Sequence, residues 1–158
     1  MRGVEPVSLA VTVLAAAAGA LLIVGEFMSI AWVDVAQRSC EVINDSNPSR
    51  ADRCSMSGFE RHGGALALLG VLAVVMGWGA GLGRSRPAAV ALLVAGAIAL
   101  GISLISDLPE TSEAGAIGQS FEGAEGRRGT GLYLDLAGGA LALLAGGLGL
   151  ARTGKPPP

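Results

Sequence analysis

Charged and aromatic residues are scarce in this sequence. Only 15% of its 158 residues are Asp, Glu, Lys or Arg and 4% are Phe, Trp or Tyr, whereas 51% are hydrophobic. A water-soluble domain exposes more charge than this. The net charge is −2 and no basic tract is present, which argues against nucleic-acid binding. There is one histidine, His62, and no G-x-S-x-G elbow or P-loop, so we expect no metal, no cofactor and no enzyme activity.

The hydrophobic residues form four long apolar runs, at residues 7–33, 63–83, 88–106 and 131–151. Each has about the 20 residues that a helix needs to cross a bilayer. The sequence therefore predicts an all-α integral membrane four-helix bundle, with residues 1–158 as one domain. Residues 34–62 and 107–130 would form long outer loops, and residues 152–158 a cytoplasmic tail. The first run is too long for the apolar region of a cleaved signal peptide.

The Lys and Arg residues predict the orientation of this bundle. One side would carry five basic residues in short segments next to span ends: Arg2, Arg84, Arg86, Arg152 and Lys155. The other side would carry six, spread through the long loops: Arg38, Arg50, Arg53, Arg61, Arg127 and Arg128. Basic residues in short segments carry most of the orientation signal. We therefore expect a multi-pass plasma-membrane protein with both termini in the cytoplasm.

The only two cysteines, Cys40 and Cys54, lie in the first long loop. On the outer side of a membrane, such a pair favours a disulfide. The two are farther apart than the C-x-x-C pairs of membrane thiol oxidoreductases, so a structural bond is favoured over a redox-active one. Closing a loop of about 15 residues would stabilise the fold by roughly 3 kcal/mol in the chain-entropy model. The sequence thus predicts a first extracellular loop that is pinned by a disulfide.

Small residues recur at steps of three and four along each predicted span. Lipid provides no hydrophobic drive for helices to associate, so close approach over small residues must hold the bundle together. The glycines that we expect at helix–helix contacts are Gly19, Gly70, Gly77, Gly81, Gly96 and Gly138.

One carboxylate lies inside the first apolar run, in the stretch LLIVGEFMSIAW at residues 21–32. This residue, Glu26, lies on the small-residue stripe of its span, as Asp135 does on the last span, so both should face the bundle interior. Residues at the neighbouring span ends lie at the same depth. The sequence therefore predicts an intramembrane polar cluster in the outer third of the bundle, formed by Glu26, Arg61, His62, Asp107 and Asp135.

Two interpretations of Glu26 are open. An ionisable residue within a membrane is a functional-site hypothesis, in which Glu26 binds a cation or passes a proton with Asp135 beside it. Alternatively, Glu26 pairs with Arg61 and ties the first span to the second. We favour the ion pair, because few polar residues lie deeper in the spans: Ser8, Thr12 and Ser103.

Several motifs resemble a set of uncharacterised four-span membrane proteins of high-GC Gram-positive bacteria. These motifs are AW at the end of the first span, GFERHGG, GRSRPAAVALL, SDLPET and GLYLDLAGG, and they extend over most of the chain. The RSRPA turn, the DLP after the third span and the GLYL followed by an acidic residue are the most specific. This resemblance implies the same topology and brings no known activity.

The layout also resembles, more weakly, that of claudin-like tetraspans. Trp32 beyond the first span, Cys40 and Cys54 in the first outer loop, and Arg61 at the start of the second span match positions in that family. The W-G-L-W signature of the family is missing, and the first loop is short. The resemblance implies a bonded cysteine pair and a barrier-forming role.

Among functions, the sequence favours a non-enzymatic structural or accessory subunit. It has more small-residue stripes than one four-helix bundle needs, so we expect contacts with the lipid bilayer and with a membrane protein partner or a second copy. The alternative is a small oligomeric transporter or channel, with Glu26 and Asp135 at an acidic outer mouth. An enzyme is the third hypothesis and has the least support.

Overall fold

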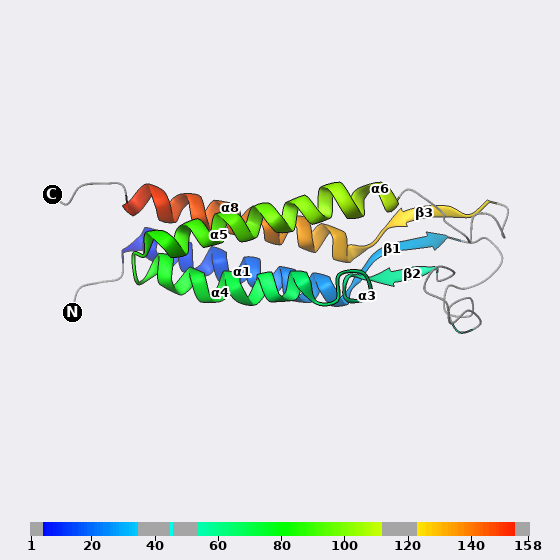
Figure 1. Ribbon diagram of the computed structural model, residues 1–158, viewed down its shortest axis with the longest axis horizontal. Helices are drawn as coiled ribbons and strands as arrows, with labels where there is room; N and C mark the ends of the chain where they lie inside the picture. The colour runs from blue at the N-terminus through cyan, green and yellow to red at the C-terminus, as the bar shows by residue number, and fades with distance from the viewer. Residues whose placement is uncertain (1–4, 35–44, 46–53, 112–122, 154–158) are drawn as a thin grey trace.

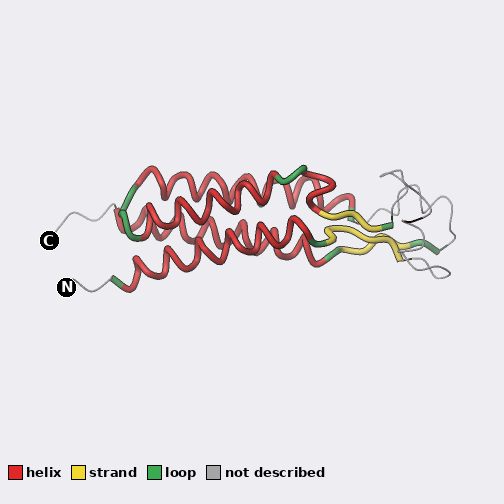
Figure 2. The backbone as a smooth tube through the Cα atoms, turned by 90° about the horizontal axis from the view of Figure 1, so that it is seen from below, coloured by secondary structure: helices red, strands yellow, loops and turns green. Residues whose placement is uncertain are grey.

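The computed structural model describes residues 5–34, 45, 54–111 and 123–153. This part of the chain is mostly helical, with long helices lying side by side and a small sheet at one end (Figure 1). In chain order the elements are α1 (Pro6–Phe27), β1 (Ser29–Asp34), β2 (Ser55–Ser57), α3 (Gly58–His62), α4 (Ala65–Gly81), α5 (Arg86–Gly101), the π-helical η2 (Ile102–Asp107), α6 (Leu108–Glu110), β3 (Glu125–Arg128) and α8 (Thr130–Thr153). We call the end with the strands the sheet end. The opposite end, where α1 begins and α8 ends, is the hairpin end (Figure 2).

Three helical segments are long and apolar enough to cross a membrane: Pro6–Phe27, Arg86–Glu110 and Thr130–Thr153. Helix α4 is also apolar but has only 17 residues. Large apolar side chains cover the outer surface of the bundle, and Leu68 and Ile105 are 72% and 80% exposed. The described residues thus hold three candidate spans, and a fourth span through α4 remains a proposal.

Local signals explain where the helices begin. Helix α1 starts at Pro6, whose fixed φ suits the first turn. Ser85 precedes α5, and its hydroxyl oxygen accepts a hydrogen bond from the Ala88 N–H at 3.4 Å. Gly63 and Gly64 precede α4 with φ values of 64° and 93°, in the left-handed region that glycine adopts without strain. These two glycines separate α3 from α4.

Each main helix packs against two neighbours. Helix α1 contacts α4 and α8, and α5 contacts the same two helices from the other side (Figures 1 and 2). Small side chains fill the interior and are at most 1% exposed: Ala15, Ala18, Ala73, Ala95, Ala99, Ala142 and Ala145. This composition lets the backbones come close together, as in other membrane bundles.

The six glycines that we expected at helix contacts all lie against a neighbouring helix. Gly19 and Gly70 bring α1 and α4 so close that a Cβ on Gly70 would lie 2.7 Å from the Gly19 carbonyl oxygen. The other four also face a partner helix: Gly77, Gly81 and Gly138 face α1, and Gly96 faces α8.

The predicted all-α class is confirmed in part: the described residues are mostly helical, but a three-stranded antiparallel sheet with the order β2-β1-β3 stands at the sheet end. Helix α1 ends at Phe27 rather than at residue 33, and the last part of the predicted span is strand β1. Trp32 pairs with Ser55 of β2 on one side and with Arg127 of β3 on the other. The two neighbouring strands provide the backbone hydrogen bonds that make the extended conformation of β1 stable.

The other predicted spans coincide more closely with helices. Helix α4 is shorter than the predicted 63–83 because the glycine pair delays its start. Helix α5, which corresponds to the predicted span 88–106, continues through η2 and α6 to Glu110. Helix α8 is slightly longer than the predicted 131–151. Parts of both predicted loops are ordered as β2, α3, α6 and β3.

Candidate functional site

The candidate site is a group of polar side chains at the sheet end, which we call the sheet-end cluster. Its members are Glu26 from the last turn of α1, Arg61 and His62 from α3, Asp107 from the end of η2, and Asp135 from α8. Glu26 and Asp135 are fully buried, and Asp107 is 1% exposed. The structure thus brings together the five residues that the sequence pattern placed at one depth.

Glu26 is bound by the backbone at the start of α4. Ser57 and Glu60 form a capping box on α3, in which the Glu60 carboxylate accepts from the Ser57 N–H at 3.0 Å. Helix α3 ends at His62 with Gly63 as its C-cap, and Gly64 then turns the chain so that its N–H donates to Glu26 Oε1 at 2.8 Å. Gly64 is the N-cap of α4, so its N–H has no acceptor within that helix. The buried carboxylate therefore ties α1 to the start of α4.

Arg61 pairs with one carboxylate on η2 and one on α6. Its Nε donates to Asp107 Oδ1 at 2.7 Å, and its Nη1 donates to the Glu110 carboxylate. Its Nη2 donates to the Ser106 carbonyl oxygen at 3.0 Å. These contacts replace the predicted ion pair between Glu26 and Arg61. The reason is that α3 is not continuous with α4, and its last turn faces η2 and α6.

His62 lies between two carboxylates. Its Nε2 is 3.0 Å from Asp107 Oδ1, within hydrogen-bond distance, and its Nδ1 is 3.9 Å from Glu26 Oε2, beyond it. The hydrogen bond to Asp107 is the main cause that raises the pKa of His62 above its ordinary value. Burial and the charge of Arg61 oppose this rise, and the charges of Asp107 and Glu26 add to it.

Asp135 has no hydrogen-bond donor among the described residues. Both of its carboxylate oxygens are buried and unpartnered. Its carboxyl group packs against Gly25, where a Cβ would lie 3.0 Å from Asp135 Cγ. Glu26, His62 and Asp107 are the charged groups that interact with it electrostatically. A buried ionised carboxylate in this position is costly, because no donor among the described residues replaces the water that it loses.

Three glycines besides the six expected at helix contacts make room for the cluster. A side chain on Gly25 would collide with the Asp135 carboxylate, and a Cβ on Gly58 would lie 2.9 Å from Glu26 Cα. A Cβ on Gly131 would lie 2.8 Å from the Gly25 carbonyl oxygen. Their signal in the sequence is position: Gly25 precedes Glu26, and Gly131 lies one turn before Asp135.

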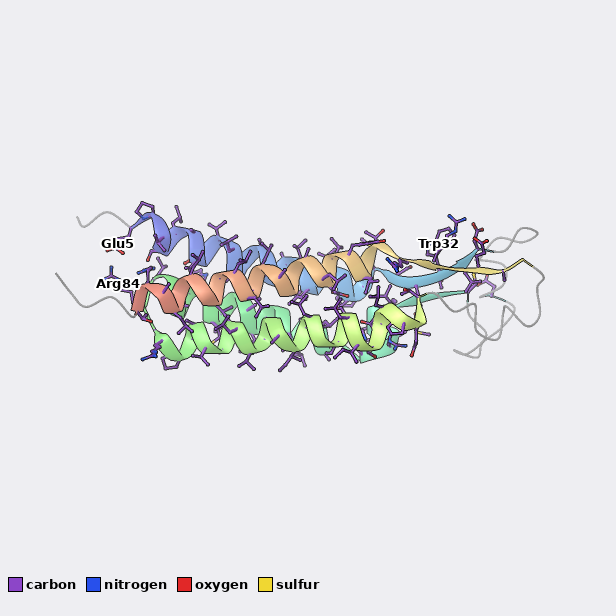
Figure 3. All side chains as sticks on the ribbon, turned by 90° about the horizontal axis from the view of Figure 1, so that it is seen from above. Glu5, Trp32 and Arg84 are labelled. Carbon is purple, nitrogen blue, oxygen red and sulfur yellow. The ribbon has the colours of Figure 1, made fainter. Side chains whose placement is uncertain are left out.

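The hairpin end carries a second polar group, which sequence reasoning also missed. Ser8 Oγ donates to the Gly81 carbonyl oxygen at 2.6 Å, and Arg152 Nη1 donates to Ser8 Oγ at 2.9 Å. Glu5 Oε2 is 3.7 Å from Arg152 Nη2, and its other oxygen accepts from Arg84 (Figure 3). The hydrogen bond from Arg84 is the main cause that lowers the pKa of Glu5. These contacts join the ends of α1, α4 and α8.

The predicted cysteine pair is only partly within the described residues. Cys54 precedes β2 and is 1% exposed. Cys40 lies outside the described residues, so the Cys40–Cys54 disulfide stays a prediction. Within the described ranges, no group of three or more His, Cys, Asp or Glu side chains is arranged to hold a metal ion.

Comparison with protein-family models, curated proteins and solved structures gives no significant match for this chain. The two resemblances of its motifs therefore stay expectations.

Proposed function

We propose that the protein is a four-span integral membrane protein of the plasma membrane that serves as a non-enzymatic structural or accessory subunit. In this proposal α1, α4, the α5–η2–α6 segment and α8 cross the bilayer. Both termini lie in the cytoplasm, as the short basic segments favour, and the sheet end lies outside. Helix α1 begins and α8 ends at the same end of the bundle, which supports placing both termini on one side of the membrane (Figure 1).

The distribution of buried polar side chains supports this role. In the described part of the chain they lie at the two ends of the bundle: Ser8 at the hairpin end, and Glu26, Ser103, Asp107, Thr111 and Asp135 at the sheet end. Between the ends, the fully buried residues are apolar: Val11, Ala15, Ala18, Leu22, Ala73, Leu92, Ala142 and Ala145. A path for ions or protons needs polar groups or water across the whole membrane. One bundle with this interior favours a structural role over a transporter or channel.

The sheet is the surface that we assign to a membrane protein partner or a second copy. It extends beyond the helices, and β3 is one of its edges (Figure 1). An edge strand offers unpaired backbone groups to another chain. The Glu125 and Arg127 side chains on this edge are 75% and 53% exposed, and the Arg127 guanidinium lies 5.8 Å from the Trp32 ring centroid. The Cys40–Cys54 disulfide would restrain the chain that leads to β2.

Site-specific photo-cross-linking in the native membrane, at native expression, tests this proposal. A photoreactive amino acid at Glu125 should give a cross-linked product of fixed mass, which mass spectrometry resolves as a partner or a dimer. The matched control is the same amino acid at Arg86, which is exposed at the hairpin end and should not give that product. No product from Glu125 would count against the contact surface. Ion or proton flux into liposomes above the empty-vesicle level would favour the channel alternative.

A further inference from the structure

The oxygen atoms of the three buried carboxylates in the sheet-end cluster outnumber the donors that reach them. Asp107 accepts from Arg61 Nε and lies within hydrogen-bond distance of His62 Nε2. Among the described residues, the Gly64 N–H is the only donor to Glu26, which leaves Glu26 Oε2 without a partner there. Asp135 is fully buried, and neither of its carboxylate oxygens accepts from a described residue. The cluster therefore lacks at least one donor between α1 and α8.

The sheet-end cluster also has more negative than positive side chains. With His62 protonated, the cluster has two positive side chains, Arg61 and His62, against three buried carboxylates. Glu110 also pairs with Arg61 and adds a further negative charge at the exposed edge. An unpaired buried carboxylate is neutralised by taking up a proton unless a cation binds to it. A metal ion needs several ligands, and the described residues hold no group of three or more His, Cys, Asp or Glu side chains arranged for one, whereas a single carboxyl can hold a proton.

Packing places the Asp135 carboxyl on α8 against the last turn of α1. The Asp135 carboxyl packs against Gly25, the residue before Glu26, and Glu26 interacts with it electrostatically. His62 Nδ1 does not satisfy Glu26 Oε2, because the two atoms are 3.9 Å apart. One proton on Asp135 would provide the missing donor and remove the excess negative charge.

We propose that the sheet-end cluster is a proton-binding site, in which the Asp135 carboxyl holds a proton and donates it in a hydrogen bond to Glu26. The proton comes from the aqueous phase at the sheet end, and its binding raises the charge of the cluster by one without any electron transfer. The groups that face Asp135 are Glu26 on α1, His62 on α3 and Asp107 on η2. The site goes beyond the structural role, because it gives the bundle a ligand.

Infrared spectroscopy of the full chain in lipid nanodiscs tests this proposal. We expect a carbonyl band from a protonated carboxyl group at neutral pH, and we expect it to shift when aspartate is labelled with ¹³C. Asp135→Asn should lose the band. The matched control Asp34→Asn, at a side chain that is 47% exposed at the end of β1, should keep it.

Glu26→Gln keeps the test decisive if Asp135→Asn does not fold. Asp135 remains in this variant but its hydrogen-bond acceptor loses its charge, so the band should persist at a shifted frequency. Absence of the band from the wild-type protein would overturn the proposal, since water or a cation would then complete the site. A band that shifts with labelled glutamate instead of labelled aspartate, or one that survives Asp135→Asn, would also overturn it.

Discussion

Replacing Gly70 by alanine is a direct test of the contact between α1 and α4. A Cβ on Gly70 would lie 2.7 Å from the Gly19 carbonyl oxygen and 3.2 Å from Leu22 Cβ. Ordinary contacts begin at 3.4 Å, so the two helices must separate by roughly 0.7 Å to admit the methyl group. Overpacking of this kind costs about 1–3 kcal/mol. We expect Gly70→Ala to loosen the interface that positions Glu26 beside Gly64.

The matched control is Gly147→Ala on α8, where an added Cβ meets no atom within 4 Å. Alanine favours a helix interior over glycine by about 1 kcal/mol, and both variants gain this amount. The difference between them therefore isolates the steric cost, and Gly70→Ala should be less stable than Gly147→Ala by about 1–3 kcal/mol. The assay is reversible unfolding in mixed micelles with increasing SDS, followed by circular dichroism. Equal free energies of unfolding for the two variants would refute the close α1–α4 contact.

Three other measurements test the Glu26 hydrogen bond, the charge of His62 and the predicted disulfide. Glu26→Ala should lower the free energy of unfolding by about 1–3 kcal/mol, because the Gly64 N–H loses its acceptor. Glu26→Gln should lower it less, because the amide oxygen can still accept that hydrogen bond. Equal losses in the two variants would contradict the hydrogen bond. The pKa of His62 is raised in the folded protein. Protonated His62 therefore stabilises the fold fully at a pH below its ordinary pKa of about 6.5, and this stabilisation is lost as the pH rises through the raised pKa. Unfolding measured across this window should show the loss in wild type and less of it in His62→Gln, and a stability that rises with pH would show that the sign is wrong. Peptide mapping without reductant should find Cys40 and Cys54 in one linked pair, and reduction should destabilise the fold by roughly 3 kcal/mol; maleimide labelling of both without reductant would contradict the bond.

The long helices could be predicted from sequence because the signal for them is local. A span needs an uninterrupted apolar run, and three such segments appear as helices of adequate length. The sheet could not be predicted in this way. The residues of β1 that favour a strand, such as Ile30 and Val33, continue the apolar run of α1, and their strand partners lie far away in the chain. Hydropathy alone does not distinguish the end of a span from a strand that follows it.

The residues of the sheet-end cluster could be predicted from their depth and helix face, whereas the ion pairs among them could not. Placing Glu26 and Asp135 toward the interior needs only the small-residue stripes. The partner of Arg61 depends on the direction of α3, which is set by the left-handed Gly63 and Gly64. The sequence pattern treated these glycines as the start of a continuous span, so it paired Arg61 with the wrong carboxylate.

The two polar ends give α1 a special position in the bundle. At the hairpin end, Ser8 on α1 contacts both Gly81 and Arg152, and at the sheet end Glu26 on the same helix contacts Gly64. Between these ends, the described contacts of α1 with its neighbours are close apolar packing. Such packing fixes the position of α1 along its axis less precisely than a hydrogen bond does. The proposed proton on Asp135 would add a third polar link, from α1 to α8, directly below the strand that continues α1 into the sheet. Loss of that proton would leave two ionised carboxylates, Glu26 and Asp135, repelling each other between α1 and α8.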